Sequence, residues 1–509
     1  MRAAQAEAAV HAVGRRMGDG AVGVVDVGSN SVRLVLYERA SRAPTVLFNE
    51  KVLAGLGGDL AEHGRLSDEA MARALAAISR FMAVARAADA DELTIVATAA
   101  ARVAANGPDF IAQIEALTGV SVRVLAGREE AEMAGRGVLC GFWRPDGVVG
   151  DLGGGSLELI DVADDRLGAG ESFELGTLRL MGDAKGDISA AREIAARALK
   201  GSKQLPLLAG RSLYAVGGTW RSLVRLHMAT GDHPIAVMHH YGIPASEMAA
   251  FCDALLSEGL EAFAAASVVS KNRRALLPWG AAVLRELLEV GRPSEVVASS
   301  LGVREGLIYH GLSQEERGRD PLLLACAEIA VLRARSPKLC AELVEWTADV
   351  FAAVGIRESE DEVRLRGAAC FLSDIGWRAH PDYRGDQAIA VISNVGLYGV
   401  DHPGRGYLAA AVLDRYGGFA DGASRPAAEA LCPPRFAQRA KVLAAAFKVA
   451  YVVAPGVAGI LPRTRVVRDG DHLALELPGE LGALEGERPR RRMRNLAKLL
   501  NLKGSVIVR

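Results

Sequence analysis

The spacing of hydrophobic residues changes repeatedly along the first 310 or so residues of the chain. Short β-branched runs alternate there with Ala- and Leu-rich segments in which apolar residues recur at helical spacing. Such runs are typical of strands and such segments of amphipathic helices, so their alternation predicts an α/β fold. The predicted strands are Val22–Asp26, Ser31–Tyr37, Leu93–Ala97, Val120–Leu125, Gly147–Asp151, Leu157–Val162 and Leu213–Val216.

Local signals add detail to this pattern. The Gly28-Ser29-Asn30 turn between the first two strands predicts a hairpin. Ser67, followed by Asp68 and Glu69, predicts a helix start. The predicted apolar face of that helix is formed by Met71, Leu75, Ile78 and Met82.

The pattern changes beyond about Asp320, where helical spacing dominates. Strand-like runs become rare there until Thr464–Glu476, near the end of the chain. The predicted helices include Leu322–Arg333, Lys338–Val354 and Arg364–Ile375. We therefore predict a separate, mostly helical domain.

Composition favours a cytoplasmic protein of more than one domain. The chain has 509 residues, half of them hydrophobic, which is enough for several cores. The apolar stretch Val442–Leu461 contains Lys448 and Pro455, and polar residues interrupt Met1–Arg16, so we expect neither a membrane span nor a secretory signal. The scattered cysteines, without a Cys-x-x-Cys pair, are predicted to be buried thiols in a reducing compartment.

Charge excludes a strong general attraction to nucleic acid or membrane, because the net charge is only −1. The charge is nevertheless uneven, since Arg488–Arg509 contains eight Lys or Arg and no acidic residue. This segment is interpreted either as a solvated tail or as a binding patch for a polyanion.

A glycine-rich turn with acidic flanks is the sharpest chemical signal. Asp151 and Glu158 enclose Gly153, Gly154, Gly155 and Ser156. Successive glycines let the backbone approach an anion and present N–H groups to it. The two carboxylates are suitable Mg²⁺ ligands, because Mg²⁺ commonly binds one or two carboxylates together with substrate phosphates. The alternative is a hairpin whose glycines serve only the turn.

A second turn of the same design precedes it in the chain. Asp26 is followed by Gly28, Ser29, Asn30 and Ser31, and then by the cation Arg33. Two such turns facing each other across a cleft would hold a phosphate chain and a metal from both sides.

In having these two acidic, glycine-rich turns, the chain resembles the ASKHA superfamily of actin, hexokinase and heat-shock ATPases. Within it, the chain resembles the exopolyphosphatase/guanosine pentaphosphatase (Ppx/GppA) family. The matching segments, in order, are Ala97–Arg102 with Asn106, Leu125–Ala131, Leu175–Arg179, Val216–Thr219 and Ser299–Gly306.

The resemblance implies two α/β ASKHA (ribonuclease H-like) lobes, followed by a mostly helical domain. It gives an N-terminal tail over 1–19, lobes over 20–126 and 127–312, and a helical domain with a small basic C-terminal segment over 320–509. It also implies a homodimer.

The resemblance also assigns roles to single residues. Glu130, directly before Ala131, matches the family's catalytic glutamate, and Glu129 is its neighbour. A carboxylate there would take the proton of an attacking water. Asp26, Asp151 and Glu158 would hold Mg²⁺. The remaining predicted phosphate-binding or cleft-lining residues are Arg33, Thr98, Arg102, Gly217, Gly218, Thr219, Arg273 and Arg274.

The implied activity is Mg²⁺-dependent, processive release of the terminal phosphate from inorganic polyphosphate. Fold and motifs do not distinguish this substrate from guanosine pentaphosphate. A basic track formed by Lys271, Arg273, Arg274 and the Arg488–Lys503 cluster favours the longer polyanion. Phosphotransfer to a nucleotide, and a non-enzymatic polyphosphate or alarmone sensor, stay open; the predicted water-activating Glu130 argues against a sensor.

In the helical domain, Cys370–Gly376 resembles the His-Asp segment of HD-type phosphohydrolases. Ser373 occupies the histidine position, which leaves Asp374 without an adjacent imidazole. His380 and His402 are each followed by proline, which biases them toward extended or turn conformations. We therefore predict that this domain is catalytically silent and extends the substrate channel or builds a dimer interface.

Overall fold

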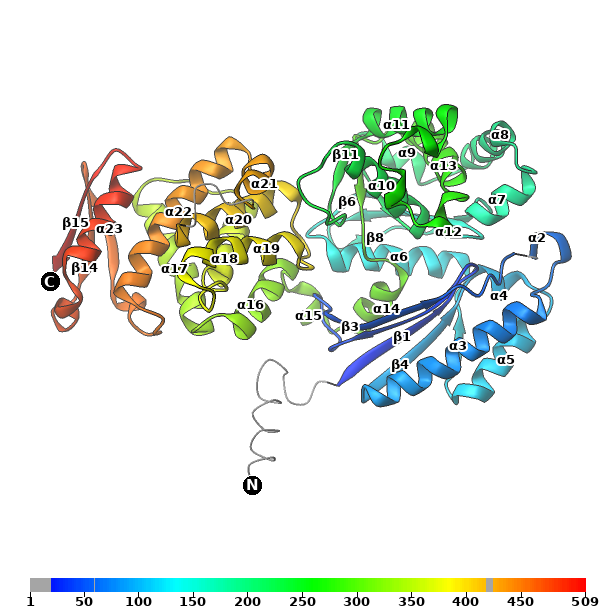
Figure 1. Ribbon diagram of the computed structural model, residues 1–509, viewed down its shortest axis with the longest axis horizontal. Helices are drawn as coiled ribbons and strands as arrows, with labels where there is room; N and C mark the ends of the chain where they lie inside the picture. The colour runs from blue at the N-terminus through cyan, green and yellow to red at the C-terminus, as the bar shows by residue number, and fades with distance from the viewer. Residues whose placement is uncertain (1–19, 59, 418–423) are drawn as a thin grey trace, which may run out of the picture. The chain divides into compact units, whose positions relative to one another are not determined.

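The computed structural model describes residues 20–58, 60–417 and 424–509. The predicted tail over 1–19, including the interpretation of Met1–Arg16, lies outside these residues. The described chain forms two compact units, of which the first ends at Pro321 and the second runs over Leu322–Arg509 (Figure 1).

The first unit begins with a five-stranded sheet in the order β3-β2-β1-β4-β5. The predicted hairpin is confirmed, because β1 and β2 pair antiparallel, and β4 and β5 add parallel strands on the other side. Helices α3 and α5 pack against one face of this sheet (Figure 1). The strands are β1 (Ala21–Val27), β2 (Val32–Tyr37), β3 (Val46–Val52), β4 (Ala90–Ala97) and β5 (Val122–Val124).

Helix α3 (Asp68–Ala87) begins after Ser67, as predicted. Its buried face differs from the prediction, because only Ile78 of the four named residues is fully buried, while Met71, Leu75 and Met82 are half-buried. Alanines and Phe81 form the centre of the interface instead. Small side chains let the helix backbone lie close to the sheet, and this places the longer residues at the margins of the contact.

A second sheet of the same unit repeats the first. Its central order β9-β7-β6-β10-β12 places an antiparallel hairpin beside two parallel strands, as in β3-β2-β1-β4-β5. Short strands β8 and β11 extend it. The strands are β6 (Asp146–Leu152), β7 (Leu157–Ala163), β8 (Arg166–Leu167), β9 (Glu171–Phe173), β10 (Ser212–Val216), β11 (Gly242–Pro244) and β12 (Glu295–Ala298).

Helices surround both sheets of this unit, and α6 and α14 cross each other at very short range. A methyl group added at Gly137 of α6 would lie 2.2 Å from the carbonyl oxygen of Gly302, and one added at Gly306 of α14 would lie 1.8 Å from that of Met133. The helices of the unit are α2 (Leu60–His63), α3, α4 (Ala99–Val103), α5 (Gly107–Thr118), α6 (Gly127–Gly141), α7 (Thr177–Asp183), α8 (Ile188–Leu199), α9 (Leu205–Leu208), α10 (Gly218–Thr230), α11 (Ala245–Glu258), α12 (Lys271–Arg274), α13 (Leu277–Gly291), α14 (Val303–Gly311) and α15 (Gln314–Gly318).

The second unit is mostly helical, as predicted. Its helices are α16 (Pro321–Arg333), α17 (Pro337–Ala353), α18 (Glu360–Leu372), α19 (Arg384–Asn394), α20 (His402–Tyr416), α21 (Ser424–Leu431), α22 (Pro434–Val453) and α23 (Glu487–Lys498). The strand-like run near the end is two strands, β13 (Arg465–Asp469) and β14 (His472–Leu477), which turn at Gly470. The basic end of the chain is folded, because α23 leads into β15 (Lys503–Val508), which pairs with β14 in parallel.

All six cysteines are buried and free, as predicted. Within the described ranges, no helix is both long and apolar enough to cross a membrane.

Candidate active site

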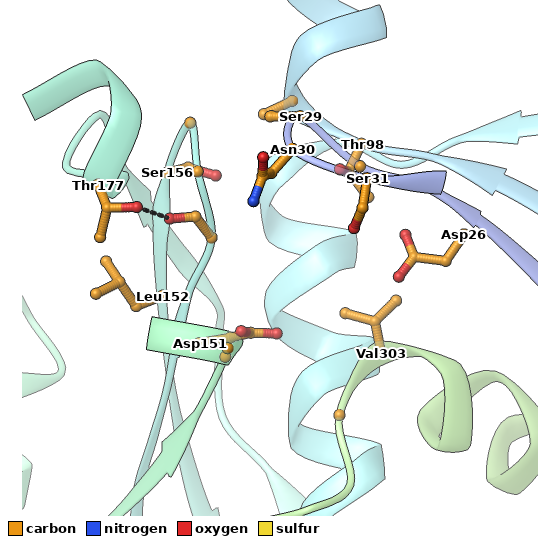
Figure 2. A pocket seen from close by; sticks show the side chains of 18 of the residues that line it. Asp26, Ser29, Asn30, Ser31, Thr98, Asp151, Leu152, Ser156, Thr177 and Val303 are labelled. Atoms are coloured by element: carbon orange, nitrogen blue, oxygen red, sulfur yellow. Dashed lines mark hydrogen bonds between the residues drawn. The ribbon is translucent and has the colours of Figure 1, made fainter. Parts of the chain in front are cut away.

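A cavity of about 180 Å³ lies between the two sheets of the first unit. The turn after β1 and the turn after β6 form opposite walls, and Figure 2 shows Asp26 and Asp151 on the two sides of the space between them. The predicted site residues that line it are Asp26, Gly28, Ser29, Asn30, Ser31, Arg33, Thr98, Glu130, Asp151, Gly153, Gly154, Gly155, Ser156, Gly217, Gly218 and Arg273. The structure thus brings together residues from distant parts of the sequence.

The two walls have the same backbone design. The Gly28 N–H donates to the Ser31 carbonyl (3.1 Å), and the Gly153 N–H donates to the Ser156 carbonyl (2.9 Å). The first helical residues of α7, Thr177 and Leu178, donate their N–H groups to Gly153 and Gly154. Both glycine turns are therefore closed by hydrogen bonds before any ligand arrives.

Close approach explains two of the glycines. A methyl group on Gly154 would lie 3.1 Å from Leu178 Cδ1 and 3.3 Å from Ser29 Cβ of the opposite turn. Gly217 has a φ of +100°, and a methyl group there would lie 2.3 Å from the Leu152 carbonyl oxygen. Larger residues would displace the walls, so these glycines serve the packing of the cavity as well as the turns.

Buried carboxylates from both turns and from α6 reach the cavity. Burial raises the pKa of Asp26, and it raises the pKa of Asp151 to about 6 against the attraction of Arg221. Glu130 lies in the first turn of α6 and is only 8% exposed. Burial and the nearby charge of Asp151 raise the pKa of Glu130 to about 7, although Arg102 donates to its carboxylate (3.1 Å).

Glu158 lies behind this group rather than on the cavity wall. Its side chain accepts a hydrogen bond from Ser172 (2.8 Å). Burial, followed by repulsion from Glu130, raises its pKa well above the usual range. The acidic cluster therefore continues into the protein behind Glu130.

A divalent cation fits this cluster. Burial raises the pKa values of Glu130, Asp151 and Glu158, so a cation beside them would stabilise their charged forms. Burial also raises the pKa of Asp26, whose Oδ2 accepts a hydrogen bond from Arg304 Nη1 (3.1 Å). No group of three or more acidic, His or Cys side chains is arranged as a metal cage in the described chain, and Mg²⁺ does not need one when substrate phosphates complete its shell.

Cationic side chains also line the wall. The cations are Arg33, Lys51, Arg221, Arg273 and Arg304. Burial lowers the pKa of Lys51 to about 8, and repulsion from Arg273, Arg33 and Arg304 contributes. Helices α10 and α14 also begin at the cavity, where their N-terminal ends favour negative charge. The cavity thus combines acidic residues beside Glu130 with a wall suited to an anion.

Four predicted residues lie outside the cavity wall besides Glu158. Arg102 contacts Glu130, as described, and Thr219 accepts a hydrogen bond from Arg273 (3.3 Å). Arg274 donates to the Val269 carbonyl (3.2 Å). Glu129 points away: its carboxylate accepts from the Ala126 N–H (2.9 Å) and pairs with Arg123 (2.9 Å), so it caps α6.

Lys51, Thr177, Arg221 and Arg304 line the cavity but were not predicted from the sequence. Thr177 and Arg304 lie inside segments that carried the family resemblance, so the motifs contained a signal for both. Lys51 lies on β3 and Arg221 on α10, each without a local motif. Their places depend on strand order and helix packing, which the sequence pattern did not specify.

Two similar sheets that present acidic, glycine-rich turns to a common cavity define an ASKHA-type α/β protein. Residues 13–315 match the model of the "Ppx/GppA phosphatase family", and residues 322–507 match "Exopolyphosphatase, C-terminal". The first match spans more than half of the sequence, and the chain belongs to this phosphatase family.

Individual relatives agree with this assignment. "Exopolyphosphatase 2" of Mycobacterium tuberculosis is 28% identical over 285 residues, covering 52% of this chain and 89% of that protein. "Guanosine-5'-triphosphate,3'-diphosphate pyrophosphatase" of Aeromonas salmonicida is 25% identical over 317 residues, which cover 59% of this chain and 62% of that protein. The solved structure of an exopolyphosphatase from Cytophaga hutchinsonii is similar in fold, with a TM-score of 0.51, 22% identity, and coverage of 57% of this chain and 96% of that one.

Proposed function

We propose that the chain is an exopolyphosphatase that releases orthophosphate from the end of inorganic polyphosphate with the help of Mg²⁺. The observation that carries the proposal is Glu130, a buried carboxylate on the wall of a cavity that is otherwise rich in cations and backbone N–H groups. Burial and the charge of Asp151 bring its pKa to about 7, where a carboxylate is a stronger base than usual.

In the proposed reaction, the terminal phosphate lies between the two glycine turns. Glu130 takes a proton from a water molecule, the water oxygen forms a bond to the terminal phosphorus, and the bond to the bridging oxygen breaks. Arg102 holds the Glu130 carboxylate in place through its hydrogen bond. Bound Mg²⁺ would neutralise charge on the phosphate oxygens, with Asp151 as the cavity-lining ligand and Glu158 supporting the site from behind.

The cationic residues of the cavity wall would bind the phosphate oxygens of the substrate. Arg33, Arg273 and Arg304 offer planar guanidinium groups that suit phosphate oxygens, and Lys51 adds a point charge. Because the charges of these groups repel each other, an anion relieves repulsion when it binds. A chain of phosphates can contact more of these cations than a single phosphate can.

Hydrolysis of guanosine pentaphosphate is the second candidate, and the name of the Aeromonas relative favours it. Phosphotransfer to a nucleotide and a sensor role are the further alternatives. One assay separates them: orthophosphate release from long polyphosphate, tripolyphosphate, guanosine pentaphosphate and ATP, each with and without Mg²⁺. We expect the highest kcat/KM for long polyphosphate; a higher value for guanosine pentaphosphate would reassign the substrate, and no release from any of them would favour the sensor.

We also propose that the protein works in the cytoplasm as a homodimer. The free, buried thiols agree with a reducing compartment. The molar mass in solution, measured by light scattering after gel filtration, tests the dimer.

A further inference from the structure

A second cavity of the first unit, of about 550 Å³, adjoins the candidate active site. Ala99, Gly155 and Ser156 line both cavities, so the wall between them consists of small residues there. A methyl group on Gly155 would lie 3.0 Å from Ala99 Cβ, and the glycine therefore keeps this wall thin. Figure 2 shows Ser156 at one end of the active-site cavity and Val303, at the start of α14, at the other.

Arg102 connects the two cavities. Its Nη1 donates to Glu130 Oε2 (3.1 Å) and to the Leu125 carbonyl (2.5 Å), and the residue also lines the second cavity. Its Nε and Nη2 form no hydrogen bond among the described residues. The candidate base on the wall of the active site is therefore one hydrogen bond away from the second cavity.

The charges of the second cavity suit a small anion. Arg128 is exposed and has no ion pair or hydrogen-bond partner for its side chain in the described part of the chain. The acidic residues of the lining are already bound, because Glu174 pairs with Arg179 (2.7 Å) and Glu171 accepts hydrogen bonds from the turn at 202–204. The N–H groups that remain free on the arginines suit phosphate oxygens.

The proposed reaction determines where its product forms. The attacking water and the leaving chain lie on opposite sides of the terminal phosphorus, because phosphoryl transfer proceeds in line. The water is next to Glu130, so the chain extends away from it toward the cations Arg33, Lys51 and Arg273, which line the active site but not the second cavity. After cleavage, a chain that stays bound to these cations blocks that side for the released orthophosphate.

We propose that the second cavity is the exit route for orthophosphate, which passes Ser156 and Arg102 and leaves the protein beside Arg128. The route binds inorganic phosphate weakly, since its few cations are partly offset by the two glutamates. It lets one cleavage follow another without release of the chain. The inference rests on the proposed hydrolysis of polyphosphate.

Val103 provides a place to block the route. It ends α4, is 55% exposed, and lines the second cavity but not the active site. All six native cysteines are buried, so a maleimide reacts selectively with a cysteine introduced at the surface. V103C labelled with fluorescein maleimide blocks the second cavity. V124C, labelled in the same way on β5 outside both cavities, is the matched control.

The test compares cleavage of long polyphosphate with release of the product. Acid quenching measures all orthophosphate formed, whereas a fluorescent phosphate-binding protein in solution measures only orthophosphate that has left the enzyme. We expect the label on V103C to slow release at least fivefold and to change the rate of the first cleavage less than twofold. Labelled V124C and both unlabelled variants should release orthophosphate as the parent does.

The length of the remaining chains gives a second readout. With the exit blocked, orthophosphate leaves through the entrance only after the chain has dissociated. Gel electrophoresis should therefore show chains of intermediate length with labelled V103C, and only full-length and very short chains with labelled V124C.

Inhibition by added orthophosphate gives a third readout. Orthophosphate that enters through the second cavity binds while a chain occupies the active site, so its inhibition should be noncompetitive with polyphosphate. R128Q should raise the inhibition constant at least threefold. R166Q, which removes an exposed arginine of β8 outside the second cavity, should leave the constant unchanged.

Other results would overturn the proposal. Release that keeps pace with cleavage in labelled V103C, or purely competitive inhibition by orthophosphate, would exclude the exit route. Slower first cleavage in labelled V103C would make the second cavity an entrance for substrate instead. No orthophosphate from polyphosphate in the parent would refute the proposed function together with this inference, whereas hydrolysis without a release defect refutes the inference alone.

Discussion

Glu129 and Glu130 show how neighbouring residues of the same type acquire different chemistry. Glu129 remains accessible and caps the start of α6, where a backbone N–H and Arg123 lower the pKa of its carboxylate. Glu130 points into the protein, where burial raises its pKa to about 7. The family resemblance separates Glu130 from its neighbour Glu129 in the sequence. The structure adds the physical difference, because only the Glu130 side chain reaches the cavity.

The Glu130→Gln variant tests the proposed base. We expect kcat to fall by about 100-fold or more, because the substitution removes the proton acceptor and changes almost no volume. Polyphosphate binding should be largely retained. Glu129→Gln is the matched variant and should keep most of the rate, since its side chain lies outside the cavity. Steady-state kinetics of both variants test the assignment of Glu130 as the base. A Glu130→Gln enzyme with half the original kcat would contradict this assignment.

Asp151→Asn and Glu158→Gln test the proposed metal site. Each removes one anionic oxygen from a site with few protein ligands, so the Mg²⁺ concentration for half-maximal rate should rise in both. The rise should be larger for Asp151→Asn, because Asp151 lines the cavity and Glu158 lies behind it. Mg²⁺ titrations of the rate are the measurement. Curves that match the parent for both variants would show that these carboxylates only shape the turn.

At the scale of elements, the sequence correctly predicted the strands and turns that are determined by local residues. The hairpin after Asp26 and the strand on each side of Gly153–Gly155 follow from apolar runs and glycine turns, and they appear in the structure as predicted. Strand β15 was not predicted, because its partner β14 supports it and its own residues, Lys503–Val508, form only a short run. The positions of Lys51 and Arg221 on the cavity wall were not predicted for a similar reason, because they depend on tertiary packing.

Gly176→Ala tests the glycine turn as a unit. A methyl group at Gly176 would lie 2.2 Å from the Gly155 carbonyl carbon, so the backbone of the turn must move. We expect KM for polyphosphate to rise about tenfold, a cost of about 1.4 kcal/mol. Gly153→Ala is the control, because its methyl group would lie 3.5 Å from the Ser156 carbonyl oxygen, an ordinary contact. Equal KM values for the two variants would contradict a packing role for Gly176.

At the scale of the molecule, the buried carboxylates should destabilise the metal-free protein as pH rises. The pKa values of Asp26, Glu130, Asp151 and Glu158 are raised by folding, so the folded state keeps protons that the unfolded state has lost. Stability is therefore lost as pH increases from about 4, the usual carboxyl pKa, through the raised values. Each pKa unit corresponds to about 1.4 kcal/mol.

Thermal unfolding of the full chain in EDTA measures this effect. We expect the unfolding temperature to fall by several degrees between pH 6 and pH 8, and Mg²⁺ at pH 8 to restore most of the loss. The fall should be smaller in Glu130→Gln, which has one ionisable group fewer. An unfolding temperature that is constant over this range and insensitive to Mg²⁺ would contradict the prediction.

The crossing of α6 and α14 also determines how the two helices hold the residues beside it. The main chains lie so close there that a methyl group on Gly137 would clash with Gly302 and one on Gly306 would clash with Met133. Glu130 and Arg304 lie within two helical turns of this contact, so the spacing between them depends on the absence of side chains at Gly137 and Gly306.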